Sequence, residues 1–168
     1  MSIRLWLARH GATDWSESGR LLGWTDVPLN RAGRNQARRI GELLSHVSLT
    51  SCWSSDLRRA TETARLAVGD AVADLRLREL DFGDLEGMMW NDFAADVREE
   101  LLRFDGFRAP GGESVPELRS RVLAFIDSLP DGDHALFTHG GVVRVVLREV
   151  SRDRRVAPGD VVRVGWRP

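Results

Sequence analysis

Lysine and tyrosine are absent from the 168-residue sequence, and cysteine occurs once, as Cys52. Without lysine there is no Schiff-base amine and no phosphate-loop lysine, so arginine supplies every permanent side-chain cation. Without tyrosine, no phenol can act as an acid or a nucleophile. A single cysteine excludes an intramolecular disulfide and favours a reducing compartment, so we expect a cytoplasmic protein.

Charge and hydropathy narrow the possible partners. The formal net charge is −1 and the 24 arginines are scattered along the chain, which is atypical of a nucleic-acid-binding protein. The apolar stretch at the amino terminus is short and contains Arg4 and Arg9, so we expect neither a signal peptide nor a membrane span. The length fits one domain, residues 1–168, with room for a substantial core.

Short apolar runs alternate with segments of helical periodicity along the whole chain. This alternation predicts a three-layer α/β/α sandwich with a mostly parallel central sheet and helices on both faces. We expect the segment 91–104 to form a helix outside the main sheet. The predicted strands are 3–8, 49–53, 75–80, 135–138 and 161–166, and the predicted helices are 31–44, one opened by 54–56, 91–104, 113–129 and 141–150.

Two histidines each follow a predicted strand and precede glycine. His10 ends the first apolar run before Gly11, and His139 ends a later one before Gly140. Ligands bind at the carboxyl ends of strands in open α/β sheets. If the two strands are parallel neighbours, the two imidazoles face one another across one pocket. Glycine after each histidine would let the backbone approach a ligand closely.

Arginines and a glutamate complete the candidate site. Arg9 adjoins His10, and Arg58 and Arg59 lie at the start of a predicted helix, where free N–H groups favour anions. Only one of this adjacent pair can face the pocket, because neighbours on a helix diverge by about 100°. Glu79 lies beside leucines, and a carboxyl in such surroundings can keep a proton near neutral pH. We expect the remaining histidines, His46 and His134, to be surface residues.

A second chemistry must be considered, because Cys52 and Arg58 match the Cys-x5-Arg signature of cysteine phosphatases. The intervening residues contain no glycine to turn backbone amides inward, and Asp56 would repel a phosphate. We therefore interpret the match as accidental and expect Cys52 to be a small buried residue.

Five motifs together resemble the histidine phosphatase (phosphoglycerate-mutase-like) superfamily, in the order of the family and over nearly the whole chain. The resemblance implies that His10 is a nucleophile that becomes phosphohistidine, and that Glu79 donates and accepts the proton. It implies that Arg9, Ser16, Arg59, His139 and Gly140 bind the substrate, and it selects Arg59 over Arg58. The motifs are Arg9-His10-Gly11, the segment 54–64, Glu79 with 82–87, Pro110-Gly111-Gly112-Glu113-Ser114 and Thr138-His139-Gly140-Gly141.

The sequence departs from the mutases of this family. Mutases carry threonine where Leu22 stands, and a lysine and an adjacent arginine pair after the acid, whereas Arg98, Arg103 and Arg108 are separated here. Ser16 stands where the family often has a phosphate-binding asparagine. These departures favour a phosphatase over a phosphoglycerate mutase. The short chain and the segment 19–26 look most like bacterial α-ribazole-phosphate phosphatases.

The resemblance therefore implies hydrolysis of a small phosphomonoester, with α-ribazole 5'-phosphate as one substrate, through a phosphohistidine and without a metal or other cofactor. Phosphoglycerate mutase is one alternative. A non-catalytic domain that binds a phosphorylated ligand is another, although binding alone needs neither His10 nor Glu79. A homodimer is left open, and we expect no membrane partner.

Overall fold

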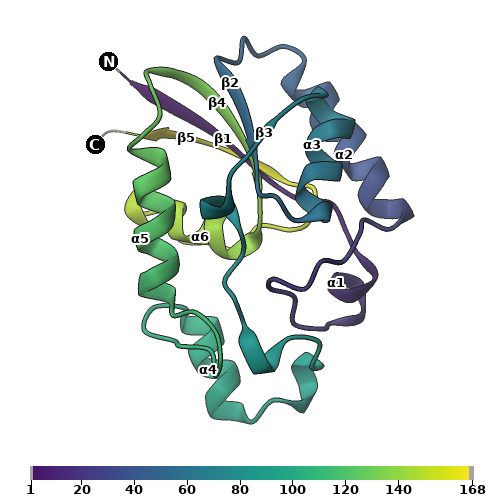
Figure 1. Ribbon diagram of the computed structural model, residues 1–168, viewed down its shortest axis with the longest axis vertical. Helices are drawn as coiled ribbons and strands as arrows, with labels where there is room; N and C mark the ends of the chain where they lie inside the picture. The colour runs from purple at the N-terminus through teal and green to yellow at the C-terminus, as the bar shows by residue number, and fades with distance from the viewer. Residues whose placement is uncertain (1, 167–168) are drawn as a thin grey trace.

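A five-stranded sheet forms the centre of the molecule, and the computed structural model describes residues 2–166 (Figure 1). The strand order is β3-β2-β4-β1-β5, and β5 runs antiparallel to β1 while the other neighbouring pairs are parallel. The strands are β1 (Ile3–Arg9), β2 (Ser51–Ser54), β3 (Val72–Ala73), β4 (Gly132–Thr138) and β5 (Val161–Trp166). The mostly parallel sheet is confirmed.

Helices cover both faces of the sheet, which confirms the predicted three-layer α/β/α sandwich (Figure 1). Helices α2 (Arg31–Leu44) and α3 (Arg58–Val68) pack on one face, against Ala8 and Phe137. Helices α5 (Val115–Ile126) and α6 (Gly140–Glu149) pack on the other face. The division follows from strand geometry, since alternate residues of β1 and β4 point to opposite faces.

The register of β1 on β4 sets the position of the candidate site. Arg9 pairs with Thr138, so the next residues along these parallel strands, His10 and His139, leave the sheet at the same edge. The His10 backbone N–H also donates to the Thr138 carbonyl oxygen at 2.9 Å. The condition under which the two imidazoles face one another, that their strands are parallel neighbours, is therefore met.

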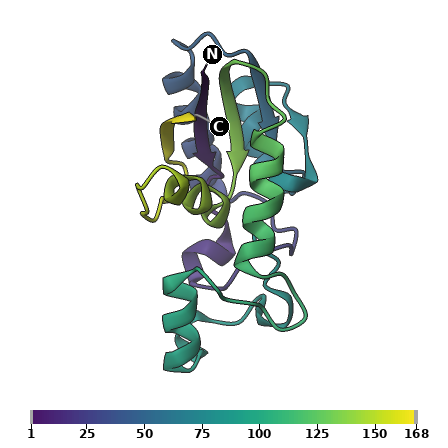
Figure 2. The same ribbon diagram turned by 90° about the vertical axis from the view of Figure 1, so that its left-hand side faces the viewer.

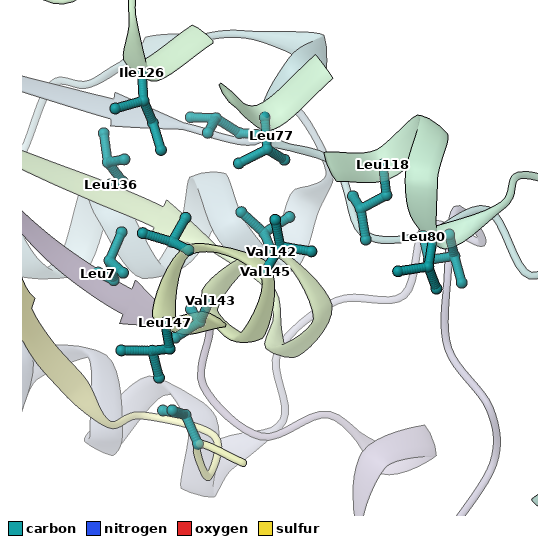
Figure 3. Close-up of a cluster of buried hydrophobic side chains, with 14 of the residues drawn as sticks. Leu7, Leu77, Leu80, Leu118, Ile126, Leu136, Val142, Val143, Val145 and Leu147 are labelled. Atoms are coloured by element: carbon teal, nitrogen blue, oxygen red, sulfur yellow. The ribbon is translucent and has the colours of Figure 1, made fainter. Parts of the chain in front are cut away.

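The segment 75–80 is not a strand, contrary to the prediction. The third strand is the two-residue β3, and residues Leu75–Leu77 form a short 3-10 helix (η1) whose first turn is capped by the Asp74 side chain. The apolar residues do not alternate between faces: Leu75 is exposed, whereas Leu77 and Leu80 are buried. Figure 3 shows Leu77 and Leu80 directed into the cluster formed with Leu118, Val142 and other leucines and valines.

Other boundaries shift by a few residues. The second helix begins at Arg58 instead of at residues 54–56, and the side chain that caps it belongs to Asp26, which accepts from the Arg58 N–H at 2.7 Å. Strand β2 ends at Ser54, and α5 starts after Ser114, which forms a capping box with Glu117.

The predicted helix 91–104 is divided. A 3-10 turn, η3 (Trp90–Asp92), precedes the shorter helix α4 (Ala95–Arg103), because Phe93 and Ala94 between them are extended. As expected, α4 lies apart from the sheet, beyond the edge to which β1 and β4 point (Figure 2). Helix α1 (Asp14–Ser18) also lies beyond this edge of the sheet. A further 3-10 turn, η2 (Gly83–Leu85), precedes η3 in the chain. Within residues 2–166, no helix combines the length and apolar character needed to cross a bilayer.

Candidate active site

A cavity of about 410 Å³ opens at the carboxyl ends of β1 and β4. Its polar lining includes Arg9, His10 and Glu79, three of the residues singled out in the sequence. The rest of the lining comes from the loop after α1, the segment 79–104, the start of α6 and the loop that follows α6. It combines the arginines Arg20, Arg144 and Arg155 with the apolar residues Leu21, Leu22, Phe82, Trp90, Leu101, Phe104 and Val156.

His10 is buried and held in one tautomer. Its Nδ1 lies 2.7 Å from the Gly11 carbonyl oxygen, so Nδ1 carries the proton and donates it to that acceptor. The other ring nitrogen, Nε2, lies 3.3 Å from Arg59 Nε, which donates to it. The contact with Arg59 requires a lone pair on Nε2, the form that a nucleophilic imidazole needs.

Gly11 itself lies against a helix. A Cβ on this residue would come within 2.3 Å of the Gly33 carbonyl oxygen in α2. The reason for glycine after His10 is therefore close packing of the loop on α2, whereas we predicted approach to a ligand.

His139 and Arg9 contribute unpaired polar atoms. The ring centroids of His10 and His139 are 5.1 Å apart, with an angle of 61° between the rings. Both nitrogens of the buried His139 ring and Nε of Arg9 lack a hydrogen-bond partner among the described residues. Arg9 is fixed through Nη1, which donates to the Val156 carbonyl oxygen at 2.6 Å. Unpaired buried polar atoms are costly, so three of them around His10 indicate a place prepared for a polar ligand.

Arg59 is fully buried and Arg58 is exposed. Besides its contact with His10, Arg59 donates to the carbonyl oxygens of Gly23 and Thr25, at 2.5 and 3.0 Å. Of the adjacent pair, Arg59 is the one that reaches His10, and its role in binding a phosphoryl group stays a prediction.

A carboxylate that we did not predict organises the loop beneath Arg59. Glu86 accepts hydrogen bonds from the backbone N–H groups of Trp24 and Thr25, both at 2.6 Å. Gly23 has no room for a side chain, since a Cβ would come within 2.3 Å of Glu86 Oε1. Glu86 lies in a motif of the family resemblance, but its loop contact joins residues about 60 positions apart, and no local pattern reveals such a pair.

Glu79 lies across the start of α6. Its Oε2 accepts from the Gly141 N–H at 3.0 Å, and its Oε1 accepts from the Leu80 N–H at 2.8 Å. A Cβ on Gly141 would lie 2.1 Å from Oε1, so glycine at 141 leaves the space that the carboxyl occupies. At Gly140 a Cβ would come within 3.3 Å of the Arg9 guanidinium carbon. Glycine at positions 140 and 141 therefore leaves room for the side chains of Arg9 and Glu79.

Ser16 lines the cavity, but its hydroxyl also serves α1. The Ser16 Oγ accepts from the Thr13 N–H at 2.9 Å and donates to the Thr13 carbonyl oxygen at 3.0 Å. One lone pair of this oxygen remains for a ligand. Its predicted role in substrate binding stays a prediction.

The electrostatic environment keeps both histidines neutral. Burial lowers the pKa of His10 well below its usual range, and the charges of Arg59 and Arg9 lower it further. The pKa of His139 is lowered in the same way, first by burial and then by Arg59. Burial also lowers the pKa of Arg59 to about 10, so its guanidinium remains charged at neutral pH. The site therefore combines neutral imidazoles with arginine cations.

These pKa shifts predict that the protein loses stability as the pH falls from about 7 to 5.5. In that range the histidines of the unfolded chain bind protons while buried His10 and His139 do not, and the unfolded state gains up to about 1.4 kcal/mol per pH unit for each histidine. Chemical denaturation across this range measures the effect. In the His10→Gln/His139→Gln variant the slope should become shallower, and in the exposed control His46→Gln it should not change. A wild-type stability that is flat across this range would contradict the shifts.

Two residues differ from their sequence-based expectation. His134 is fully buried, not on the surface, and its ring nitrogens lie 2.7 Å from Ser51 Oγ and 2.8 Å from the Pro130 carbonyl oxygen. These partners satisfy the ring and explain why it can be buried. Cys52 is half-buried instead of buried, because it packs at the margin of the cluster between the sheet and α2.

Cys52 does not belong to the cavity. It pairs with Ala135 inside β2, before the carboxyl end of the strand, and Asp56 of the Cys-x5-Arg match is paired with Arg78. Burial raises the pKa of the Cys52 thiol, which disfavours the nucleophilic thiolate. The geometry agrees with our interpretation of that match as accidental.

A sheet edge that carries two facing neutral histidines, the buried Arg59, the half-buried Arg9 and a carboxyl is an arrangement suited to binding and transferring a phosphoryl group. Comparison with known families agrees, since the histidine phosphatase superfamily (branch 1) matches residues 5–158. The chain belongs to this superfamily, as the sequence motifs predicted.

Some relatives of this chain are named phosphoglycerate mutases, and one is named a phosphatase. The chain is 34% identical over 163 residues to the 2,3-bisphosphoglycerate-dependent phosphoglycerate mutase 2 of Gloeobacter violaceus, covering 86% of this chain and 74% of the relative. It is 48% identical to the solved structure of a phosphoglycerate mutase from Thermus thermophilus, with a TM-score of 0.89 and coverage of 96% and 92%. A structure from Escherichia coli, proposed as an alpha-ribazole-5'-P phosphatase, is 27% identical, with a TM-score of 0.84 and coverage of 98% and 91%.

Proposed function

We propose that the protein is a phosphomonoesterase that transfers the phosphoryl group of a small ester to His10 and then to water. The observation that carries this proposal is His10 itself: a neutral imidazole whose Nδ1 proton is donated to the Gly11 carbonyl oxygen, leaving the Nε2 lone pair beside Arg59. A group that only bound phosphate would gain more from a charged imidazolium. A neutral ring with an unprotonated Nε2 suits a nucleophile.

In the first half of the reaction, His10 Nε2 forms a bond to phosphorus as the bond from phosphorus to the ester oxygen breaks. The guanidinium groups of Arg9 and Arg59 neutralise the phosphoryl oxygens, and His139, with both nitrogens unpaired, contributes a further hydrogen bond. Protonated Glu79 gives its proton to the departing alcohol oxygen.

In the second half, Glu79 has become a carboxylate and takes a proton from water. The resulting hydroxide oxygen attacks phosphorus, the bond to His10 Nε2 breaks, and inorganic phosphate leaves. The protein returns to its starting protonation state, and the proposed steps need no group other than its own side chains and water.

The lining of the cavity favours hydrolysis over isomerisation of phosphoglycerate. Leu22 lines the wall at the position where the sequence comparison with mutases calls for threonine. Arg103 and Arg108 do not line the cavity and are paired with Glu99 and Glu117 on the surface. At this position Leu22 gives the carboxylate of a glycerate substrate no polar partner, and the arginines that line the cavity are Arg9, Arg20, Arg144 and Arg155.

The same lining supports a larger alcohol group. A volume of about 410 Å³ falls within the roughly 300–1,000 Å³ of pockets that enclose drug-sized ligands. Three aromatic side chains, Phe82, Trp90 and Phe104, line this space together with the arginines Arg20, Arg144 and Arg155. A phosphorylated sugar with an aromatic base, such as α-ribazole 5'-phosphate, fits walls of this kind.

Phosphorus NMR on one enzyme preparation separates the two activities. We expect inorganic phosphate from 4-nitrophenyl phosphate and from α-ribazole 5'-phosphate, with the higher kcat/KM for the latter. We expect no conversion of 3-phosphoglycerate to 2-phosphoglycerate, with or without 2,3-bisphosphoglycerate. Isomerisation faster than hydrolysis would identify a mutase, the function named for two of the relatives. Tight phosphate binding with neither reaction would support the non-catalytic alternative.

A further inference from the structure

Arg121 of α5 directs three of its five N–H donors to the segment that carries Glu79. Its Nη1 donates to the carbonyl oxygens of Arg76 and Arg78, at 2.8 and 2.7 Å. Its Nη2 donates to the carbonyl oxygen of Glu79 at 2.8 Å. The remaining two N–H groups bind Glu113 at 2.7 and 2.8 Å. A guanidinium has five N–H donors, so none is left for any other partner.

Apart from Arg121, single contacts hold this segment, among them the Thr138 hydroxyl, which donates to the Leu77 carbonyl oxygen at 2.7 Å. Residues 78–82, around Glu79, belong to no helix or strand, so no regular ladder of hydrogen bonds fixes their path. The Glu79 carbonyl oxygen has one further donor, Trp24 Nε1, at 2.8 Å. On the carboxyl side the Glu113 N–H donates to the Asp81 carbonyl oxygen at 2.9 Å.

The ion pair with Glu113 fixes the position of the Arg121 guanidinium. The side chains of Arg121 and Glu113 are 18% and 14% exposed, and their two-point contact orients the plane of the guanidinium. Five bonds to fixed partners constrain Arg121 more than an ordinary surface ion pair does, and three of them reach backbone carbonyl oxygens within residues 76–79.

We propose that Arg121, oriented by Glu113, is a positioning residue that holds the Glu79 carboxyl where it protonates the leaving group; this inference rests on the proposed function. Arg121 does not line the cavity and touches no reacting atom. Its effect passes through the backbone of residues 76–79. A shift of the Glu79 carboxyl impairs proton transfer and leaves the attack of His10 intact.

The dependence of kcat/KM on the leaving group tests this role. An alkyl phosphate must receive a proton as its alcohol departs, whereas 4-nitrophenyl phosphate releases a stabilised phenolate that needs none. For Arg121→Met we expect kcat/KM for an alkyl ester to fall by on the order of 10²-fold, and that for 4-nitrophenyl phosphate to stay within a few-fold of wild type. Retained activity on the aryl ester also reports that the variant has folded.

Several comparisons sharpen the test. Arg119 lies on the same helix with an exposed ion pair to Glu149, so Arg119→Met should affect neither substrate. Arg121→Lys keeps the charge but not the five bonds, and should show most of the selective loss. Glu113→Gln should show a smaller loss of the same kind. If Arg121→Met does not fold, Arg121→Lys and Glu113→Gln carry the test.

Glu79→Gln separates the two proposals. If Glu79→Gln shows the selective alkyl loss and the Arg121 and Glu113 variants show equal losses on both esters, Arg121 is only structural and the positioning role is wrong. If Glu79→Gln itself shows no selectivity, the acid role of Glu79 is wrong and the positioning role fails with it. If the wild type hydrolyses neither ester, the proposed function fails. If Glu79→Gln and the Arg121 and Glu113 variants all lose activity on the alkyl ester and keep it on the aryl ester, the positioning role is supported.

Discussion

Replacing His10 with alanine is expected to lower kcat by on the order of 10⁴-fold or more, by analogy with removal of the nucleophile from other enzymes that form covalent intermediates. The His10 ring supplies the Nε2 lone pair that receives the phosphoryl group, and among the described residues it is the histidine that lines the cavity. Cys52 is remote from the cavity within β2, and its buried thiol has a raised pKa.

Steady-state hydrolysis of 4-nitrophenyl phosphate measures the effect, with the thermal unfolding midpoint as a check on folding. His46→Ala, a change at an exposed histidine, is the matched control and should keep wild-type activity. A His10→Ala variant that retains a substantial fraction of the wild-type rate would contradict the covalent mechanism. Loss of activity in Cys52→Ser together with activity in His10→Ala would instead support the cysteine-phosphatase interpretation.

Arg59→Ala should lower kcat/KM by on the order of 10²- to 10³-fold, which is the typical loss when one preorganised hydrogen-bond donor that stabilises a transition state is removed. Arg59 is buried, its Nε already reaches His10 Nε2, and two loop carbonyl oxygens fix its other nitrogens. A bound phosphoryl group on Nε2 would meet this guanidinium directly. Arg59→Lys should restore little of the loss, because an ammonium cannot reproduce the planar fork.

Arg58 is the matched control for Arg59. It precedes Arg59 on the first turn of α3, but its side chain is exposed, so Arg58→Ala should change kcat/KM by little more than a solvated charge contributes. Both variants should be measured on one substrate at one ionic strength, because the substrate is an anion. Greater damage from Arg58→Ala would show that the assignment of this motif to the phosphoryl site is wrong.

The layered fold and the approximate place of the site could be predicted because they depend on strong local patterns. Two apolar strands ending in His-Gly specify the same edge of a parallel sheet, and β1 and β4 are neighbours as expected. The segment 75–80 was predicted wrongly because its leucines imitate an alternating strand, whereas the Asp74 cap and burial of Leu77 and Leu80 produce a 3-10 turn. Alternation over so few residues is a weak signal.

The supports of the site could not be predicted, because they join residues far apart in the sequence. Glu86 holds the loop under Arg59, and Arg121 holds the backbone before Glu79 across more than 40 positions. In a chain with 24 arginines, nothing local distinguishes Arg121 from a solvated surface charge. His134 was misplaced for the same reason, since Ser51, the partner that allows its burial, lies on another strand.

Direct detection of a phosphohistidine tests the central claim of a covalent intermediate on His10. The protein is mixed with 4-nitrophenyl phosphate, quenched in alkali to preserve phosphohistidine, digested and mapped by mass spectrometry. We predict one added phosphoryl group on the peptide that contains His10, labile to acid and absent from His10→Ala. Hydrolysis by the wild type with no phosphoryl group on His10, or with the group on Cys52 or His139, would contradict the account.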